Sequence, residues 1–491
     1  MITQQTQQQE RSSLQIGKKA FFSAIIILLV LMLFAGVLTR IVPSGEYQRQ
    51  QIDGREMVIP GSYAPVDVSP PPVWRWFTAP FEVLWGSDSL TINTIILLLV
   101  LISGAFHILE FGGIMRSILR VLVERFKHKK YLLMAIIIFF FMFSAAVLGI
   151  YEGMVPMVVI VVPLAYALGW DSLTGLGMSL LAMAFGFSAA VTNPFTIGVA
   201  QGIAGLPLFS GAWLRIIFFI VVYGLVFLFV RRHALKVEQN PRLSPVYNED
   251  LEVRQNYSMD PKEGESYLEG EQLRRSLWWV LGWIGAAIAF VLVSSQIESI
   301  AFLAFPGMGF LFFIAGVGGG FLAGLSSRTI AGVFLKGTLS ILPAVLLIMM
   351  AMSVKHIISL GGIMDTILFH ASELIRGTGP SVAALLIYAL TMLLNFFVAS
   401  ASAKAFLMMP ILAPLADLVG LTRQTVVLAF DFGDGFSNMI YPSNPLLLIA
   451  LGFTVVSYPK WLKWTLPIQG MVFALTLVFL LVAVSIGFGP F

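Results

Sequence analysis

The stretch Thr192-Asn193-Pro194-Phe195-Thr196 interrupts one apolar run, and Ser443-Asn444-Pro445 interrupts another. The two Asn-Pro pairs lie 251 residues apart (444 − 193), and Pro414-Leu415-Ala416 follows Pro163-Leu164-Ala165 at the same offset. The spacing from the first proline to the asparagine is therefore 30 residues in both places (193 − 163 and 444 − 414). A motif repeated with unchanged internal spacing indicates an internal duplication of the chain.

The duplication extends toward the N-terminus. Gly112-Gly113-Ile114-Met115 recurs as Gly361-Gly362-Ile363-Met364 at an offset of 249, and His107 precedes the first copy as His356 precedes the second. An insertion of two residues near 376–380 accounts for the change of offset from 249 to 251. We expect the paired glycines to turn the chain from a spanning helix into short interfacial helices over 114–126 and 363–376.

The composition places the chain in a membrane. Of its 491 residues, 58% are hydrophobic and 11% are charged, against about 25% charged in a typical soluble domain. A mean hydropathy of +0.89 would give a soluble globule a continuous apolar surface. Soluble enzymes, nucleic-acid-binding proteins and disordered proteins are therefore excluded, and the lipid bilayer is an expected partner. The sequence has no cysteine and no Walker A motif, which excludes zinc thiolates, iron–sulfur clusters and ATP-driven chemistry within this chain.

The basic residues orient the chain. Arg11, Lys18 and Lys19 precede the first apolar run at 20–42, which is long enough to span about 30 Å of hydrocarbon. Residues 116–130 hold six Lys or Arg residues against one acidic residue, and basic residues flank the 231–275 loop. By the positive-inside rule these loops and the N-terminus are cytoplasmic, and residues 43–88 lie outside. We therefore predict a multi-pass protein of the inner (plasma) cell membrane with a cytoplasmic N-terminus.

The order of crossings makes the two copies antiparallel. The apolar segments 131–169 and 380–420 are interrupted near 149–153 and 399–404, which favours re-entrant hairpins with their tips at these residues. Two full crossings in place of each hairpin would leave the same polarity. The segment with His107 then runs inward and the segment with His356 runs outward, an inversion typical of secondary transporters. The predicted fold is an all-α polytopic membrane protein with inverted repeats, two re-entrant hairpins and two broken helices.

The expected organisation follows from these segments. It comprises a cytoplasmic N-terminus at 1–19, repeat 1 at 20–231, a cytoplasmic loop at 232–275, a linking helix at 276–299 and repeat 2 at 300–491. Repeat 1 contains scaffold helices, the hairpin 131–169 and the broken helix 171–208. Repeat 2 contains scaffold helices, the hairpin 380–420 and the broken helix 422–456.

Each helix break is suited to ion binding. Pro194 and Pro445 remove backbone donors within apolar segments and leave carbonyls without partners. Such carbonyls, with the oxygens of nearby hydroxyl and amide side chains, can coordinate a cation such as Na⁺. A simple helix kink at Asn-Pro is the structural alternative, and the coupling ion stays open between Na⁺ and H⁺. The predicted cation-binding residues are Thr192, Asn193, Thr196, Ser443 and Asn444.

Four charged residues fall in otherwise apolar sequence, namely Glu152, Lys404, Asp431 and Asp434. A charge at the centre of a bilayer costs at least about 2.5–3.5 kcal/mol, so its presence indicates a function. The two hairpin tips contribute unlike groups, Glu152 from the first and Lys404 from the second. We predict that Lys404 binds the carboxylate of a zwitterionic substrate and that Glu152 or Asp434 binds its ammonium group. A structural ion pair between Glu152 and Lys404 is the alternative.

Four polar residues, Asp431, Asp434, Ser437 and Asn438, follow helical spacing and form one stripe on a single helix. The glycines between these positions would let a substrate approach the backbone. We interpret the stripe as a surface that contacts substrate or cation, with helix packing as the alternative.

Several runs resemble a known family. Ala200 to Gly205, Asn395 to Val398, Pro410 to Gly420 and Phe432 to Ser437 are similar to the C4-dicarboxylate anaerobic carrier family, in its YfcC-like branch with arginine/ornithine-antiporter relatives. The resemblance covers nearly the whole chain. It implies membership of the ion transporter superfamily, with inverted repeats, hairpins, elevator-type movement against a scaffold, and a homodimer. It also implies binding residues at the hairpin tips and breaks. With the polar stripe, the predicted substrate-binding residues are Glu152, Asn395, Ser400, Ser402, Lys404, Asp431, Asp434, Ser437 and Asn438.

The sequence favours one function over three others. Secondary active transport of a small charged metabolite, by antiport or ion coupling, fits the repeats and the breaks. An amino acid, such as a basic amino acid, is favoured over a C4-dicarboxylate, because two substrate carboxylates would face several acidic residues. A channel is a remote alternative. So is an intramembrane aspartyl protease, because two catalytic aspartates that share a proton should come from separate helices. We therefore expect a transporter, with no enzymatic activity and no cofactor beyond a coupling ion.

Overall fold

The computed structural model describes residues 18–52, 55–86, 89–126, 128–256, 270–294 and 303–489. Residues 1–17 of the expected N-terminal segment, 257–269 of the expected loop and 295–299 of the expected linking helix lie outside the described residues. The described chain is mostly helical, as the composition predicts, and two small sheets follow its first helix.

The helices of the first half are interrupted repeatedly, and η denotes a short 3-10 or π-helical turn. In chain order they are α2 (Lys18–Ile41), α3 (Val73–Glu82), α4 (Ser89–Phe111), α5 (Ile114–Phe126), α6 (Lys130–Leu148), η1 (Glu152–Met157), α7 (Val158–Ala167), α8 (Ser172–Leu176), η2 (Gly177–Leu181), α9 (Ala182–Ser188), η3 (Pro194–Gly198), α10 (Val199–Ile203) and α11 (Ala212–Gln239).

The remaining helices include long elements and a second interrupted series. They are η4 (Pro241–Leu243), α12 (Tyr247–Asn256), α13 (Gly270–Ser294), α14 (Ala304–Leu322), α15 (Ser327–Leu360), α16 (Met364–Arg376), α17 (Pro380–Phe397), α18 (Ala401–Val419), α19 (Arg423–Gly435), η6 (Phe436–Met439), α20 (Pro445–Gly452) and α21 (Tyr458–Ser485).

Eight of the described helices are long and apolar enough to cross a membrane: α2, α4, α6, α11, α15, α17, α18 and α21. The expected spans at 20–42, 89–111 and 330–358 correspond to α2, α4 and α15. Large apolar side chains on α2, such as Phe22, Ile26 and Val30, are exposed, which is favourable only where lipid or another protein covers them. These helices form a multi-pass membrane protein.

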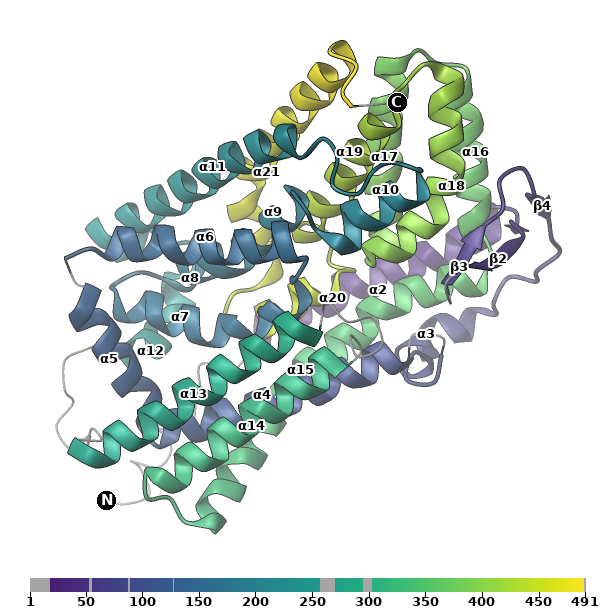
Figure 1. The fold of residues 1–491 in the computed structure, drawn as a ribbon. Helices are drawn as coiled ribbons and strands as arrows, with labels where there is room; N and C mark the ends of the chain where they lie inside the picture. Colours follow the sequence, from purple (N-terminus) through teal and green to yellow (C-terminus); the bar gives the residue numbers. More distant parts are fainter. Residues whose placement is uncertain are drawn as a thin grey trace.

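The helices form two groups (Figure 1). In the first group α4, α13, α14 and α15 lie side by side, and α2 and α3 pack against α15. Glycine permits this close packing, since a Cβ atom on Gly316 of α14 would lie 2.7 Å from the Cα of Ala105 on α4. The second group contains α6, α9 and α11 from the first half and α17, α18, α19 and α21 from the second half. Two short helices beside the second group connect it to the first, since η1 contacts α14 and α20 contacts α15.

The short helices predicted after the paired glycines are present. Gly113 and Gly362 have positive φ angles of 70° and 62°, a conformation that favours glycine, and α5 and α16 begin directly after this turn. Two antiparallel strand pairs, β1 (Gly45–Glu46) with β4 (Ala64–Pro65) and β2 (Arg49–Ile52) with β3 (Arg55–Val58), lie near α16. Asp365 of α16 accepts hydrogen bonds from the Tyr47 N–H (2.9 Å) and from the Arg49 guanidinium (2.9 and 3.0 Å). The segment after α2 is therefore held onto the second half.

The loop predicted at 232–275 is partly helical. The sequence predicts a helix end at residue 231, but α11 continues to Gln239, because Arg, Lys, Glu and Gln have high helix propensity. Helix α12 then presents Asp250, whose carboxylate accepts hydrogen bonds from Tyr166 Oη (2.9 Å), Ser172 Oγ (2.7 Å) and Ser172 N–H (2.9 Å). Burial, and next the charge of a neighbouring aspartate, raise the pKa of Asp250 to about 7. The segment between the halves thus packs against the start of α8.

Candidate functional site

Both apolar segments predicted to have tips are interrupted near the expected residues. Helix α6 ends at Leu148 because Gly149 adopts a left-handed conformation (φ 71°), and η1 starts at Glu152. Helix α17 ends at Phe397, and α18 begins after Ser400, whose hydroxyl accepts a hydrogen bond from the Ala403 N–H (3.4 Å). We name residues 149–153 the first tip and residues 398–402 the second tip.

The two Asn-Pro motifs have the same local structure. Asn193 precedes η3, and its Oδ1 accepts hydrogen bonds from the Phe195 N–H (2.9 Å) and the Thr196 N–H (3.3 Å). Asn444 precedes α20, and its Oδ1 accepts a hydrogen bond from the Leu446 N–H (2.9 Å). In both motifs proline occupies the first helical position, where its missing N–H costs no hydrogen bond. We name residues 189–193 the first break and residues 440–444 the second break.

The hydroxyl residue before each asparagine connects its break to a neighbouring helix. Thr192 Oγ1 donates to the Val147 carbonyl at the end of α6 (3.1 Å). Ser443 Oγ donates to the Phe396 carbonyl at the end of α17 (2.7 Å). Each break is therefore fixed to the helix that leads into the tip of its own half.

A cavity of about 250 Å³ lies between the tips. Residues from both tips line it, together with residues next to both breaks and one residue of α13. Among the described residues that line it, Glu152 is the only charged one. The lining residues are Gly149, Ile150, Tyr151, Glu152, Gly153, Phe187, Phe195, Val291, Ala399, Ser400, Ala401, Ser402, Asn438, Asn444 and Leu446.

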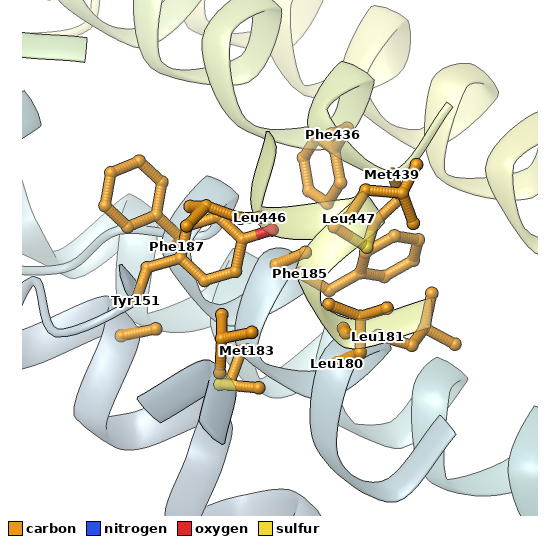
Figure 2. Close-up of a cluster of buried hydrophobic side chains, with 14 of the residues drawn as sticks. Tyr151, Leu180, Leu181, Met183, Phe185, Phe187, Phe436, Met439, Leu446 and Leu447 are labelled. Atoms are coloured by element: carbon orange, nitrogen blue, oxygen red, sulfur yellow. The ribbon is translucent and has the colours of Figure 1, made fainter. Parts of the chain in front are cut away.

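One wall of the cavity is apolar and continues into a buried cluster (Figure 2). The rings of Tyr151 and Phe187 lie 5.4 Å apart, and deeper in the cluster Phe185 contacts Phe436 at 5.2 Å. Sequence reasoning did not select Tyr151 or Phe187, because aromatic residues are too frequent in this chain to mark a site. The cavity therefore combines an aromatic wall with one carboxylate.

A closed polar network lies behind the second tip. Lys404, fully buried, forms an ion pair with Asp434 and donates a hydrogen bond to Asn395 Oδ1. Asn395 Nδ2 donates to the Asp434 carbonyl (2.7 Å), to Ser437 Oγ (2.7 Å) and to Asn438 Oδ1 (2.9 Å). Five of the predicted substrate-binding residues thus bind one another. Of these five, only Asn438 also lines the cavity.

The network reaches the second break, since Asn444 Nδ2 donates to Asn438 Oδ1 (2.7 Å). Lys404 is therefore connected through Asn395 and Asn438 to the residue that caps α20. No ion pair joins Lys404 to Glu152 in the described part of the chain, although sequence reasoning considered that pair. Glu152 is instead exposed to the cavity.

The first break lies near a different set of buried polar groups. Asp431 of α19 is 1% exposed and Thr196 of η3 is 0% exposed. Within the described residues, neither oxygen of the Asp431 carboxylate nor the Thr196 hydroxyl has a hydrogen-bond partner. Arg215, near the start of α11, is also buried beside this break. Sequence reasoning missed Arg215, although an arginine close to the start of an apolar helix was a usable signal.

Comparisons with known proteins identify the family. A family model described as C4-dicarboxylate anaerobic carrier matches residues 21–485. The chain belongs to the C4-dicarboxylate anaerobic carrier family. A relative from Escherichia coli (strain K12), named "Putative basic amino acid antiporter YfcC", is 31% identical over 498 aligned positions, which cover 94% of this chain and 96% of the relative. An uncharacterized protein of Haemophilus influenzae is 27% identical over 396 positions, covering 80% and 75% of the two chains.

Solved structures of transporters also resemble this chain. The YdaH transporter of Alcanivorax borkumensis has a TM-score of 0.42 and 18% identity, covering 96% of this chain and 100% of that one. MtrF of Neisseria gonorrhoeae, described within a class of antimetabolite efflux pumps, has a TM-score of 0.38 and 15% identity, covering 95% of each chain. The family match over residues 21–485, and not these likenesses, makes the chain a member of a membrane transporter family.

Proposed function

We propose that this member of the carrier family is a secondary active transporter of an amino acid, and specifically of a basic amino acid. The observation that carries the proposal is the charge of the cavity. Glu152 is the only charged residue among the described residues that line it, so the cavity favours a ligand with an ammonium or guanidinium group. The name of the YfcC relative, which describes a basic amino acid antiporter, agrees with this ligand class.

The remaining lining residues suit the other parts of such a ligand. The N-terminus of α18, a helix of 19 residues, reaches the cavity through Ser400, Ala401 and Ser402. Its partial positive charge and its free N–H groups favour a carboxylate. The rings of Tyr151 and Phe187 can pack against a guanidinium or ammonium group. A volume of about 250 Å³ lies below the roughly 300–1,000 Å³ of drug-sized sites and suits a small metabolite.

The ligand chemistry assigns the predicted residues to different tasks. Glu152, Ser400 and Ser402 would contact the substrate, and Asn438 and Asn444 would contact it from the second break. Lys404, Asp434, Asn395 and Ser437 would support the cavity from behind, because their polar groups are engaged with one another. In this proposal the substrate carboxylate meets the α18 N-terminus rather than the Lys404 ammonium.

The movement proposed for transport uses the two helix groups. We propose that the first group is a scaffold and that the second, with its tips as re-entrant hairpins, moves against it in an elevator-type cycle. The cavity supports this division, because Val291 of α13 faces residues of both tips across it. The inverted repeats with the boundaries given above, a cytoplasmic N-terminus, the inner (plasma) membrane and a homodimer belong to the same proposal.

The C4-dicarboxylate alternative follows from the description of the family model. It requires the cavity to accept two substrate carboxylates beside Glu152, which repels them unless it is protonated. A protease is disfavoured because Asp431 and Asp434 lie on the same helix, α19, and Asp434 is paired with Lys404. A channel is disfavoured because paired helix breaks at matched positions are typical of secondary transporters.

The test is ligand-dependent thermal stabilisation of the purified protein. Lysine or arginine should raise the melting temperature, whereas succinate and fumarate should not. Glu152→Gln should raise the half-saturation concentration of the amino acid at least 10-fold, because a hydrogen bond to a charged group contributes about 1.5–3 kcal/mol. Glu271→Gln, which changes an exposed carboxylate paired with Arg275, is the matched control and should bind as the wild type does. Stabilisation by succinate alone would overturn the proposal.

A further inference from the structure

Beside the first break lie buried side-chain oxygen atoms that have no hydrogen-bond partner among the described residues. They are the two carboxylate oxygens of Asp431 and the hydroxyl oxygen of Thr196. Thr196 and the N–H of Ala190 lie near the Asp431 carboxylate, and α19 contacts η3. Neither Asp431 nor Thr196 lines the cavity. These oxygens therefore form a polar location separate from the proposed substrate site.

The nearby guanidinium of Arg215 is engaged elsewhere. Its Nε and Nη2 donate to the Val191 carbonyl (3.2 and 3.1 Å), its Nη1 to the Ser210 carbonyl (3.0 Å), and its Nη2 also to the Phe209 carbonyl (3.2 Å). These carbonyls lie in segments where the helices are interrupted, and Arg215 satisfies them. Arg215 contributes positive charge to the neighbourhood of Asp431, but its hydrogen-bond donors serve the backbone.

The charges of the interior do not balance. Among the described residues of the cavity, the polar network and the surroundings of the first break, there are three carboxylates (Glu152, Asp431 and Asp434) and two cationic groups (Lys404 and Arg215). The pair Lys404–Asp434 is internally neutral. An ionised carboxylate without a partner at this depth costs several kcal/mol, so Asp431 is stable in its ionised form only with a cation bound beside it.

We propose that Asp431 and Thr196 bind a monovalent cation, Na⁺, which serves as the coupling ion of transport. Carboxylate, hydroxyl and free backbone oxygens are the ligands that alkali cations take at interrupted helices. One such cation would also neutralise the ionised Asp431 carboxylate. The inference rests on the proposed function for its role in coupling, but Na⁺ binding itself can be measured without any substrate.

The proposal assigns the cation to the first break alone. Of the five residues that the sequence pattern selects for cation binding, Thr196 is the one whose side-chain oxygen has no partner among the described residues. The oxygens of Asn193 and Asn444 accept hydrogen bonds from helix N–H groups, and the hydroxyls of Thr192 and Ser443 donate to carbonyls. Asp431, which the sequence grouped with substrate contacts, becomes the charged ligand.

The experiment compares melting temperatures of the purified protein in NaCl and in choline chloride at equal ionic strength, with no amino acid present. The wild type should be stabilised by Na⁺ in a saturable manner. Asp431→Asn and Thr196→Val should each raise the half-saturation concentration of Na⁺ at least 10-fold. Thr465→Val changes another buried threonine, whose hydroxyl donates to the Trp461 carbonyl within α21, and should keep the wild-type response.

The outcomes separate this inference from the proposed function. Glu152→Gln should keep the Na⁺ response and lose the response to lysine, while Thr196→Val should do the reverse. Retention of the Na⁺ response in both Asp431→Asn and Thr196→Val overturns the cation site. So does a wild type that responds to acidification and not to Na⁺, which would indicate proton coupling. Loss of lysine binding with an intact Na⁺ response counts against the proposed function alone.

Discussion

The two helix breaks have the same local backbone structure, but their buried polar groups differ in their hydrogen bonding. At the second break Asn444 donates to Asn438, which also accepts from Asn395, and Asn395 accepts from Lys404, the partner of Asp434. At the first break Asn193 caps η3, but its Nδ2 has no partner among the described residues, and the same is true of Thr196 and Asp431.

If the two segments are copies of one another, as the sequence predicts, this difference favours different roles for the two copies. A buried network in which every member is paired makes one arrangement rigid, whereas unpaired buried groups are costly unless a ligand satisfies them. In the proposal above, the second break holds a fixed geometry and the first break binds a ligand. Each of the following predictions tests that contrast, beginning with the largest effect.

The largest expected effect comes from breaking the Lys404–Asp434 ion pair in the polar network behind the second tip. Lys404→Gln leaves Asp434 buried without its cation and should lower the free energy of unfolding by about 3–5 kcal/mol. Lys404→Gln/Asp434→Asn removes both charges and should recover most of that loss. The measurement is the chemical denaturation midpoint in detergent, followed by tryptophan fluorescence. A double variant as unstable as the single one would show that the pair does not act as a unit.

The positions at which many helices end and begin could be predicted from the sequence. Glycine with positive φ at residues 149 and 420, and proline after each capping asparagine, are local signals, and the repeat allowed each copy to support the other. The helix interruptions and the short helices α5 and α16 were predictable for this reason. The inverted orientation and the hairpin character of the tips are predictions that need topology measurements.

The pairing of the charges did not follow from the sequence. The sequence places Lys404 on the tip opposite Glu152, but α18 begins at Ala401, so Lys404 lies inside its first turn and faces Asn395 and Asp434. The direction in which a side chain points depends on the exact residue at which its helix begins, and sequence patterns do not fix that residue. Asp431 and Asp434 likewise share a helix stripe but have different neighbours, because residues three apart are rotated by about 60° around the axis.

The next effect concerns the contact between the first tip and the first break. Gly149 has φ 71°, and a Cβ atom there would lie 2.4 Å from Asn193 Oδ1. Gly149→Ala should therefore cost about 1–2 kcal/mol for the left-handed conformation and about 1–3 kcal/mol for the overlap. Gly202→Ala is the control, since its Cβ would meet nothing within 4 Å, and it should be neutral or slightly stabilising. Equal melting temperatures for the two variants would mean that the tip and the break are not in close contact.

The smallest effect is the sharpest test of the contrast, since it changes the same residue type at both breaks. Asn193→Ala removes a helix cap and should cost about 1 kcal/mol. Asn444→Ala removes a cap and also the hydrogen bond to Asn438, so its cost should be larger by about 0.5–1.5 kcal/mol. Both differences can be measured as shifts in the free energy of unfolding.

The ligand responses of the two asparagine variants should run in the opposite order. Asn193 holds the turn that presents Thr196 toward Asp431, so Asn193→Ala should weaken the Na⁺-dependent rise in melting temperature although it is the milder change in stability. Asn444→Ala should keep that rise, because the groups it touches are already paired with one another. A cation site divided between both breaks would instead make the two variants lose the response together. A purely structural role for both breaks would leave the response unchanged in each.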